Sequence, residues 1–183
     1  KMVAGLGDSR GELRLTSAKS LGSVGEEAIP ILCEALKNSS NTIIRRASAK
    51  TLNIIGNKKA LPNLIEAFET DEDPVVQGSS AGAMATIGEP SIQPLLKILT
   101  ETKCTAFQIG LINLALGFIG SKSPMAFHSA VSSTNPEIRI AALSALAEQA
   151  QKHENTEVRL LILNALKDPD SEVRAEAATI VGK

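Results

Sequence analysis

The sequence has no tryptophan and no tyrosine, and only four of its 183 residues are phenylalanine. It therefore offers no aromatic platform on which nucleic-acid bases could stack, and its net charge of −1 gives no basic field to attract phosphates. These two absences exclude nucleic acid as an expected partner. Because 43% of the residues are apolar, a core is still expected, built from Ala, Leu, Ile and Val in closely packed helices.

Cysteine and histidine are equally scarce. Cys33 and Cys104 lie far apart and lack CxxC spacing, which predicts a reduced, cytoplasmic protein without a disulfide framework. Cys33 is expected in the core, and Cys104 near a turn with no base in the sequence beside it. Two isolated histidines, His128 and His153, cannot supply the three or four ligands of a metal site. The sequence also lacks a phosphate-binding glycine loop, a G-x-S-x-G motif and supported carboxylate pairs, so no catalytic residue is predicted.

The longest uncharged stretch includes TAFQIGLINLALGFIG, residues 105–120. The uncharged residues from Cys104 to Ser121 reach the lower limit of a membrane span. Gln108, Asn113 and three glycines argue against that interpretation, and so does the repeat pattern described next. We therefore expect a helix of a repeat and no membrane insertion. A helix that is apolar all round is either covered on both sides or presents one side to a partner.

A pattern of about 32 residues recurs along the chain. Its strings are ELRLTSAKSLGSVG (12–25), IIRRASAKTLNIIG (43–56), VVQGSSAGAMATIG (75–88), GLINLALGFIG (110–120), PEIRIAALSALAEQA (136–150) and SEVRAEAATIVGK (171–183). Shorter apolar segments lie between the strings, most with a proline near the start, where a missing N–H costs least. The pattern predicts an all-α fold, a right-handed α-solenoid of about six stacked helix pairs. We expect a single domain, residues 1–183, whose two ends look cut from a longer array.

Local signals mark the ends of these helices. Asp and Asn residues precede the second helix of several pairs as caps, and glycines are expected to end four of these helices: Gly25, Gly56, Gly88 and Gly120. The inserted segment Gln151–Asn155 predicts a longer loop. The acidic run from Glu66 to Asp73 is expected to be a solvated helix end and turn.

One basic position recurs in the second helices as Arg14, Arg45, Arg139 and Arg174, with Gln77 in its place in the third repeat. Asp8 precedes Arg14 by six residues, and Asp168 precedes Arg174 by the same interval. We expect these side chains to form an internal ladder with the aspartates of the turns and not to bind a ligand.

Two strings carry a family resemblance: DPDSEVRAEAATIVG (168–182) and AIPILCEAL (28–36). They resemble HEAT repeats and, more narrowly, the E/F-type phycobilin lyases of phycobilisomes in cyanobacteria. The resemblance implies a protein that binds a phycobilin, a phycobiliprotein or both, for chromophore attachment, detachment or chaperoning. It implies no covalently bound cofactor, a phycobilin as ligand, and a phycobiliprotein subunit or a second HEAT-type lyase subunit as partner. The acceptor's cysteine is implied to supply the thiol, so the lyase needs no nucleophile.

Two other classes of HEAT protein do not fit the sequence. Deoxyhypusine hydroxylases use repeated His-Glu pairs, whereas this sequence has only His153-Glu154. A HEAT-type DNA glycosylase needs a basic groove and aromatic residues, and the sequence lacks both. The alternative is a non-enzymatic scaffold that recognises a helical segment of a partner protein.

The candidate binding residues are those on the side of the second helices opposite the core. They are Lys19, Arg46, Lys50, Gly78, Gly82, Gly110, Leu111, Leu114, Gly117 and Phe118. Four of them are mid-helix glycines, each costing about 0.5–1 kcal/mol relative to alanine. Tight packing between neighbouring helices explains such glycines, and so does a slot for a flat ligand or a partner helix. A phycobilin, a planar tetrapyrrole with two propionates, fits the second explanation, with the three cations available for its carboxylates.

Overall fold

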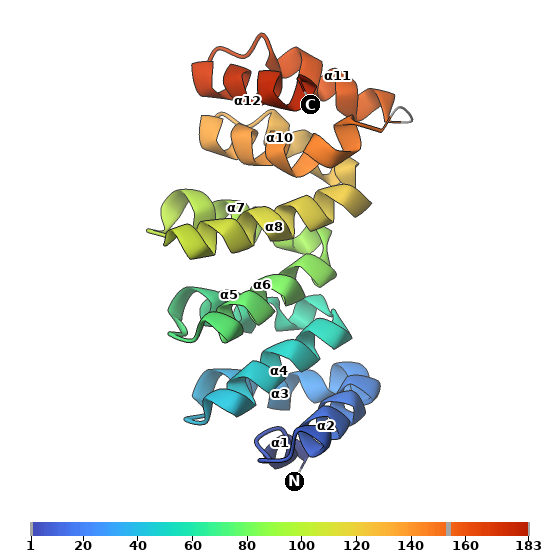
Figure 1. Cartoon of the computed structure of the whole chain (residues 1–183), viewed down its shortest axis with the longest axis vertical. Coiled ribbons are helices and arrows are strands. Elements are labelled where there is room, and N and C mark those ends of the chain that lie inside the picture. Colours follow the sequence, from blue (N-terminus) through green and yellow to red (C-terminus); the bar gives the residue numbers. More distant parts are fainter. Residues whose placement is uncertain (1, 153–154, 183) are drawn as a thin grey trace. The chain divides into compact units, whose positions relative to one another are not determined.

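The computed structural model describes residues 2–152 and 155–182, and every regular element in these ranges is helical (Figure 1). By its internal contacts the chain divides into two compact units, residues 1–87 and 88–183. The helices alternate in order as first and second members of six pairs. The predicted all-α fold of HEAT-like helix pairs is confirmed, and a single domain over residues 1–183 stays a prediction.

The first unit contains three helix pairs. Its elements are α1 (Met2–Gly5), α2 (Gly11–Val24), η1 (Gly25–Ala28), α3 (Ile29–Asn38), α4 (Thr42–Ile55), η2 (Lys58–Ala60), α5 (Leu61–Thr70) and α6 (Pro74–Ile87). The second helices α2, α4 and α6 pack side by side, and α3 and α5 pack against α4 and α6 respectively. Two layers of helices therefore share one core.

The second unit repeats this arrangement. Its elements are η3 (Glu89–Ser91), α7 (Ile92–Glu101), α8 (Ala106–Lys122), η4 (Pro124–Phe127), α9 (His128–Val131), α10 (Pro136–Ala150), α11 (Thr156–Ala165) and α12 (Ser171–Val181). Helix α10 packs between α8 and α12, while α7, α9 and α11 form the first-helix layer. The inserted loop predicted at 151–155 falls partly outside the described residues.

The core is mostly aliphatic, as the composition predicts, with Phe68 and Phe127 also fully buried in it. Leu32, Leu64 and Leu96 recur at an interval of 32 residues and are each at most 1% exposed. The second helices contribute small residues such as Ala49 and Ala81, which let neighbouring helices approach closely.

The repeated basic residue makes the same hydrogen bond in five of the second helices. It is the fourth residue of its helix, and its side chain donates to the backbone carbonyl six residues earlier in the chain. The donors are Arg14 to Asp8, Arg45 to Ser39, Gln77 to Asp71, Arg139 to Ser133 and Arg174 to Asp168, at 2.6–3.0 Å. Glutamine can replace arginine at position 77 because one N–H donor is enough. The side chain thereby ties the turn to the helix that follows it.

Two of these arginines also join consecutive repeats. Arg45 contacts both carboxylate oxygens of Asp71, and Arg139 contacts both of Asp168, at 2.7–3.2 Å. The hydrogen bond from Arg139 lowers the pKa of Asp168. The predicted ladder of arginines and aspartates is confirmed for Arg45 and Arg139, with the carboxylates coming from the next turn along the chain, whereas Arg14 and Arg174 bind backbone carbonyls of their own turns.

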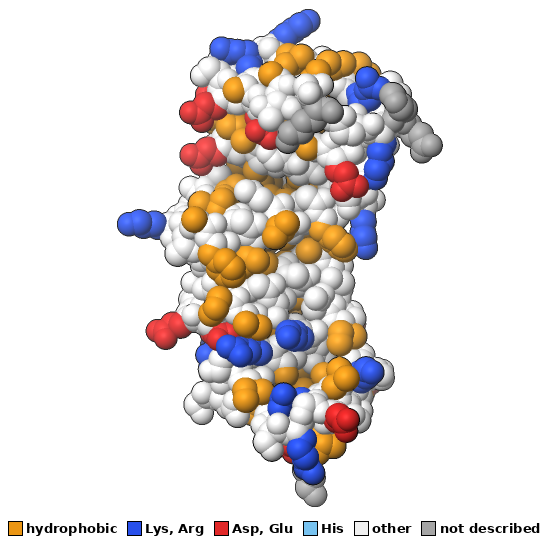
Figure 2. All heavy atoms as spheres, viewed as in Figure 1, with side chains coloured by type: hydrophobic (Ala, Val, Ile, Leu, Met, Phe, Trp, Pro, Cys, Tyr) orange, Lys and Arg blue, Asp and Glu red, His pale blue; other side chains and the backbone are white. Residues whose placement is uncertain are grey.

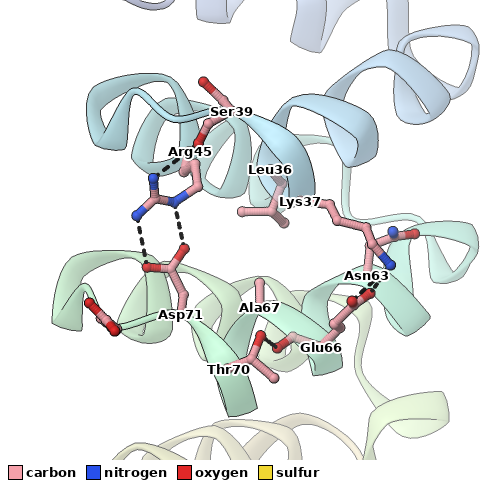
Figure 3. A pocket seen from close by; sticks show the side chains of 10 residues that line it. Leu36, Lys37, Ser39, Arg45, Asn63, Glu66, Ala67, Thr70 and Asp71 are labelled. Atoms are coloured by element: carbon pink, nitrogen blue, oxygen red, sulfur yellow. Dashed lines mark hydrogen bonds and ion pairs between the residues drawn. The ribbon is translucent and has the colours of Figure 1, made fainter.

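The acidic run from Glu66 to Asp73 is not simply solvated, contrary to the prediction. Figure 3 shows Asp71 bound by Arg45 and Glu66 facing Lys37, whose Nζ lies 2.8 Å from the carboxylate. Asp73 is paired with Arg46. Local sequence patterns do not reveal these contacts, because the partners lie 26 to 29 residues earlier in the chain.

Three of the four predicted helix-ending glycines do end their helices. Gly25, Gly56 and Gly88 have φ values of 72°, 61° and 82°, in a region that favours glycine. The prediction is wrong for Gly120, which lies inside α8, because that helix continues to Lys122. Gly120 is buried, and a Cβ atom there would collide with the backbone carbonyl of Ala145 in α10. Its function is close helix packing within the second unit.

Replacing Gly120 by alanine should therefore destabilise the protein by about 1–3 kcal/mol, because a backbone carbonyl cannot move as a flexible side chain can. Gly117→Ala on the same helix is the matched control, since nothing within the second unit lies within 4 Å of its added Cβ. That change should be neutral or stabilising by up to about 1 kcal/mol. Urea unfolding measures both variants, and equal stabilities would contradict the packing role of Gly120.

Asp73 allows a pH test of the ion pair with Arg46. The hydrogen bond from Arg46 lowers the pKa of Asp73 from its ordinary value of 3.8 to about 2. The carboxylate's stabilising effect is therefore complete above about pH 5 and is lost as the pH falls through about 2. Asp73 also accepts hydrogen bonds from the backbone N–H groups of Val75 and Val76, and an asparagine keeps that capping ability.

We expect Asp73→Asn to lower the thermal midpoint by a few degrees at pH 7 and the difference from the wild type to shrink to a small fraction of this near pH 2. Thermal unfolding across this pH range measures the difference. A gap that is the same at pH 2 and pH 7 would show that the charge of Asp73 contributes nothing.

Candidate functional site

The first unit carries an apolar groove between two of its second helices, α2 and α4. The groove has a volume of about 510 Å³ and is lined by Arg14, Leu15, Ala18, Ile43, Arg46, Ala47, Lys50 and Ile54. We call it the α2–α4 groove. Figure 2 shows hydrophobic and basic side chains next to each other over these two helices. Its volume lies within the range of small-molecule sites.

Helical periodicity places the lining residues on one face. In α4, Ile43, Ala47, Lys50 and Ile54 follow one another at intervals of three or four residues, which brings them to the same side of the helix. The side chain of Asn41 caps the start of α4 by accepting a hydrogen bond from the N–H of Ile43, and this cap fixes the residue at which the helix begins. The apolar lining residues remain accessible: Leu15 is 56% exposed and Ile54 is 62% exposed.

The cations around the groove differ in what they already bind. Arg46 donates from Nε and Nη2 to the two carboxylate oxygens of Asp73, at 2.9 and 2.5 Å. Arg14 donates from Nη1 to the backbone carbonyls of Asp8 and Ser9. Lys50 is exposed and, among the residues that the structure describes, forms no ion pair. The residues lining the groove include no acidic side chain.

The second unit carries a different surface, the exposed side of α8. We call it the α8 face and define it by Phe107, Gly110, Leu111, Leu114, Gly117 and Phe118. Leu114 is 73% exposed, while Phe107 and Phe118 are 50% and 44% exposed. Lys122, at the end of the same helix, places its Nζ 4.3 Å from the centre of the Phe118 ring. A capping box of Thr105 and Gln108 begins the helix, whose fourth residue, Ile109, has no donor to replace the repeated arginine.

The candidate glycines do not share one explanation. Around Gly110 and Gly117, nothing within the second unit lies within 4 Å of an added Cβ, so packing inside that unit does not require either. A Cβ at Gly82 would meet the side chain of Asn53 at an ordinary 3.5 Å. Gly78 is half-buried on the same helix, α6. For Gly82, Gly110 and Gly117, tight packing within their own units is not the reason for glycine.

The structure thus divides the predicted candidate residues between the two units. Lys19, Arg46 and Lys50 lie on α2 and α4, and Gly78 and Gly82 lie on α6 of the same unit. The other five candidates form most of the α8 face. Lys19 is exposed on α2 and does not line the groove. Whether any of these residues binds a ligand stays a prediction.

Of the eight residues that line the groove, only Arg46 and Lys50 were predicted as binding residues, and among those that were missed are Arg14 and the apolar pair Ile43 and Ile54. A signal for the pair was present, since Ile43 precedes Arg46 by three residues and Ile54 follows Lys50 by four. These intervals place both isoleucines on the face that was already assigned to the two cations.

A second hollow in the first unit is polar, and its cations already form ion pairs within the protein. It has a volume of about 310 Å³ and lies beside the Arg45–Asp71 and Lys37–Glu66 ion pairs, as Figure 3 shows. Because both of its lining cations, Lys37 and Arg45, are already paired with carboxylates, it offers less to an anionic ligand than the α2–α4 groove does.

The cysteines and histidines suggest no reactive site. Cys33 is buried, and burial raises the pKa of its thiol to about 11, so it is protonated at neutral pH. Cys104 is half-buried, and its Sγ donates to the carbonyl of Ile98 at 3.6 Å. His128 is exposed on α9, and His153 and Glu154 lie outside the described residues. The described part of the chain contains no cluster of His, Cys, Asp or Glu that could hold a metal ion.

Within the described ranges, no helix has the length and apolar character needed to cross a membrane. The uncharged stretch instead forms α8, which is packed along α10.

Three comparisons with known proteins extend these observations. The bilin biosynthesis protein MpeU of Synechococcus sp. strain WH8020 is 86% identical over all 183 residues, and the chain spans 62% of that protein's length. The solved structure of YibA from E. coli superposes with a TM-score of 0.54 at 19% identity, covering 98% of this chain and 68% of that one, which supports the fold alone.

The complex of CpcE and CpcF of phycocyanin lyase from Nostoc sp. PCC7120 superposes with a TM-score of 0.46 at 20% identity, covering 98% of this chain and 95% of that one. A superposition this loose carries no inference about function or partners.

The family comparison agrees with the helix pairs described above. The model of HEAT repeats matches residues 1–85 and 124–183. The unmatched stretch contains α7 and α8, and α8 is the helix that lacks the repeated donor. Since the matched residues make up well over half of the sequence, the chain belongs to the HEAT-repeat family.

Proposed function

We propose that this chain acts in bilin biosynthesis as a member of the phycobilin lyase group of HEAT-repeat proteins. In this role it binds a phycobilin, a phycobiliprotein or both while the chromophore is attached, detached or chaperoned. The observation that carries the proposal is the 86% identity with the Synechococcus bilin biosynthesis protein across the whole of this chain.

The two surfaces fit the two kinds of partner that this role needs. The α2–α4 groove combines an apolar lining with cations and no acid, which suits a flat apolar pigment that carries carboxylates. The α8 face is apolar and exposed, which suits a protein surface. We assign it to a phycobiliprotein subunit or to a second HEAT-type lyase subunit, and we place the protein in the cytoplasm.

The chemistry asked of the chain is binding and positioning. A phycobilin would be held without a covalent bond to this protein, and the thiol would come from the cysteine of the acceptor. Neither cysteine of this chain is needed as a nucleophile, which agrees with the raised pKa of Cys33.

A non-enzymatic scaffold that recognises a helical segment is the alternative function. The α8 face alone favours it, because a stripe of apolar residues along one helix can take the apolar side of a partner helix. The α2–α4 groove and the identity with a bilin biosynthesis protein favour the first proposal.

Co-expression tests the function directly. The 183-residue chain is produced together with the enzymes that make a phycobilin and with a phycobiliprotein subunit, and the pigment bound to each protein is measured by absorbance after purification. We expect the chain to change the amount of pigment on the acceptor by at least about tenfold or to become coloured itself. Pigment yields that are the same with and without the chain, together with a colourless chain, would contradict the proposal.

Leu114→Glu should reduce this effect by about tenfold, because it places a charge in the middle of the α8 face. Leu160→Glu is the matched control, since Leu160 is also exposed, at 53%, but lies on α11. Should both variants retain the full effect, the α8 face would have no part in the function.

A further inference from the structure

We propose that the α2–α4 groove is the pigment site and that Lys50 is the residue that pairs with a carboxylate of the phycobilin. This inference rests on the proposed function and adds to it the part of the chain that recognises the ligand.

The cations that line the groove differ in whether a ligand carboxylate can bind them. A bound carboxylate would have to displace Asp73 from Arg46, where the two groups share a bidentate ion pair and the Asp73 side chain is only 13% exposed. Displacing it would also weaken the start of α6, since Asp73 caps the N–H groups of Val75 and Val76. Arg14 is similarly held by two carbonyls of the turn before α2. Lys50 is the lining cation that a ligand can bind without breaking a contact described above.

Lys50 lies among apolar residues of the groove. It lies one helical turn from both Ala47 and Ile54 in α4, and the facing wall from α2 contains Leu15 and Ala18. An ammonium group beside an apolar surface attracts an anion more strongly than one fully surrounded by water, because the local dielectric constant is lower. Since the lining contains no acid, the groove selects against cationic ligands.

The lining of the groove matches the chemistry of a phycobilin. The groove, of about 510 Å³, places the apolar side chains of Leu15, Ile43 and Ile54 beside the ammonium group of Lys50. An open-chain tetrapyrrole has the complementary parts, an apolar conjugated body and propionate side chains. Charge complementarity therefore favours a carboxylated pigment over a neutral one.

The experiment compares a phycobilin as the free acid with its dimethyl ester, in which the propionate charges are removed. Binding to the purified chain is followed by the change in pigment absorbance. We expect the wild type to prefer the free acid by about five- to tenfold. Lys50→Gln should weaken binding of the free acid by a similar factor and leave the ester unchanged, so that the preference disappears.

Two matched controls separate the groove from the rest of the unit. Lys58→Gln alters another exposed lysine, on η2, and should keep the preference. Ile54→Glu places a negative charge in the groove and should weaken binding of the free acid by at least about tenfold. Ile31→Glu alters an apolar residue of similar exposure on α3 and should not.

The outcomes distinguish this inference from the proposed function. A wild type that binds the free acid and the ester equally, or that keeps its preference in Lys50→Gln, overturns the assignment of Lys50 and leaves the bilin function in place. Binding that survives Ile54→Glu overturns the groove as the site. A wild type that binds no phycobilin at all, and changes no pigment yield in co-expression, overturns both.

Discussion

The hydrogen bond from the fourth residue of a second helix to the carbonyl six residues earlier is the polar contact that the repeats share most widely. It ties the turn to the helix that follows, and it recurs in α2, α4, α6, α10 and α12, whereas α8 forms its helix pair without it. Because the side chain sits between turn and helix, its charge is used inside the repeat. The residue that follows this position, such as Arg46 in α4, can then differ from one repeat to the next. The exposed surfaces of the second helices accordingly differ between the two units.

In the first unit the groove between α2 and α4 is lined by one cation, Lys50, that forms no ion pair among the described residues. Arg45 follows the repeat rule and binds Ser39 and Asp71, and the next residue, Arg46, binds Asp73. Only one helical turn further on, at Lys50, does a positive charge on this face of α4 point to solvent without an ion pair among the described residues. The same fold that makes the arginines structural therefore leaves a lysine for recognition. In the second unit α8 has Ile109 at the repeat position and exposes apolar residues instead of cations.

Much of the fold follows from the sequence because its signals are local and repeated. The interval of 32 residues, the capping residues such as Asn41 and Asp170, and the glycines Gly25, Gly56 and Gly88 each act within a few residues of their own position. Gly120 shares the spacing of these glycines but lies at a helix contact, and no local pattern reveals that a carbonyl of α10 approaches it. The ion pairs of Asp71 and Asp73 were missed for the same reason, since their partners come from the preceding repeat.

The candidate site could be predicted only in part. Helical periodicity placed Lys50 and Arg46 on the same face, but it could not show that Arg46 is held by Asp73. A crystal structure of the chain with a bound phycobilin would show directly which cation the pigment uses. We expect a propionate oxygen within about 3 Å of the Lys50 Nζ, with Arg46 still paired to Asp73. A pigment bound away from the α2–α4 groove, or one whose carboxylate has displaced Asp73 from Arg46, would contradict this expectation.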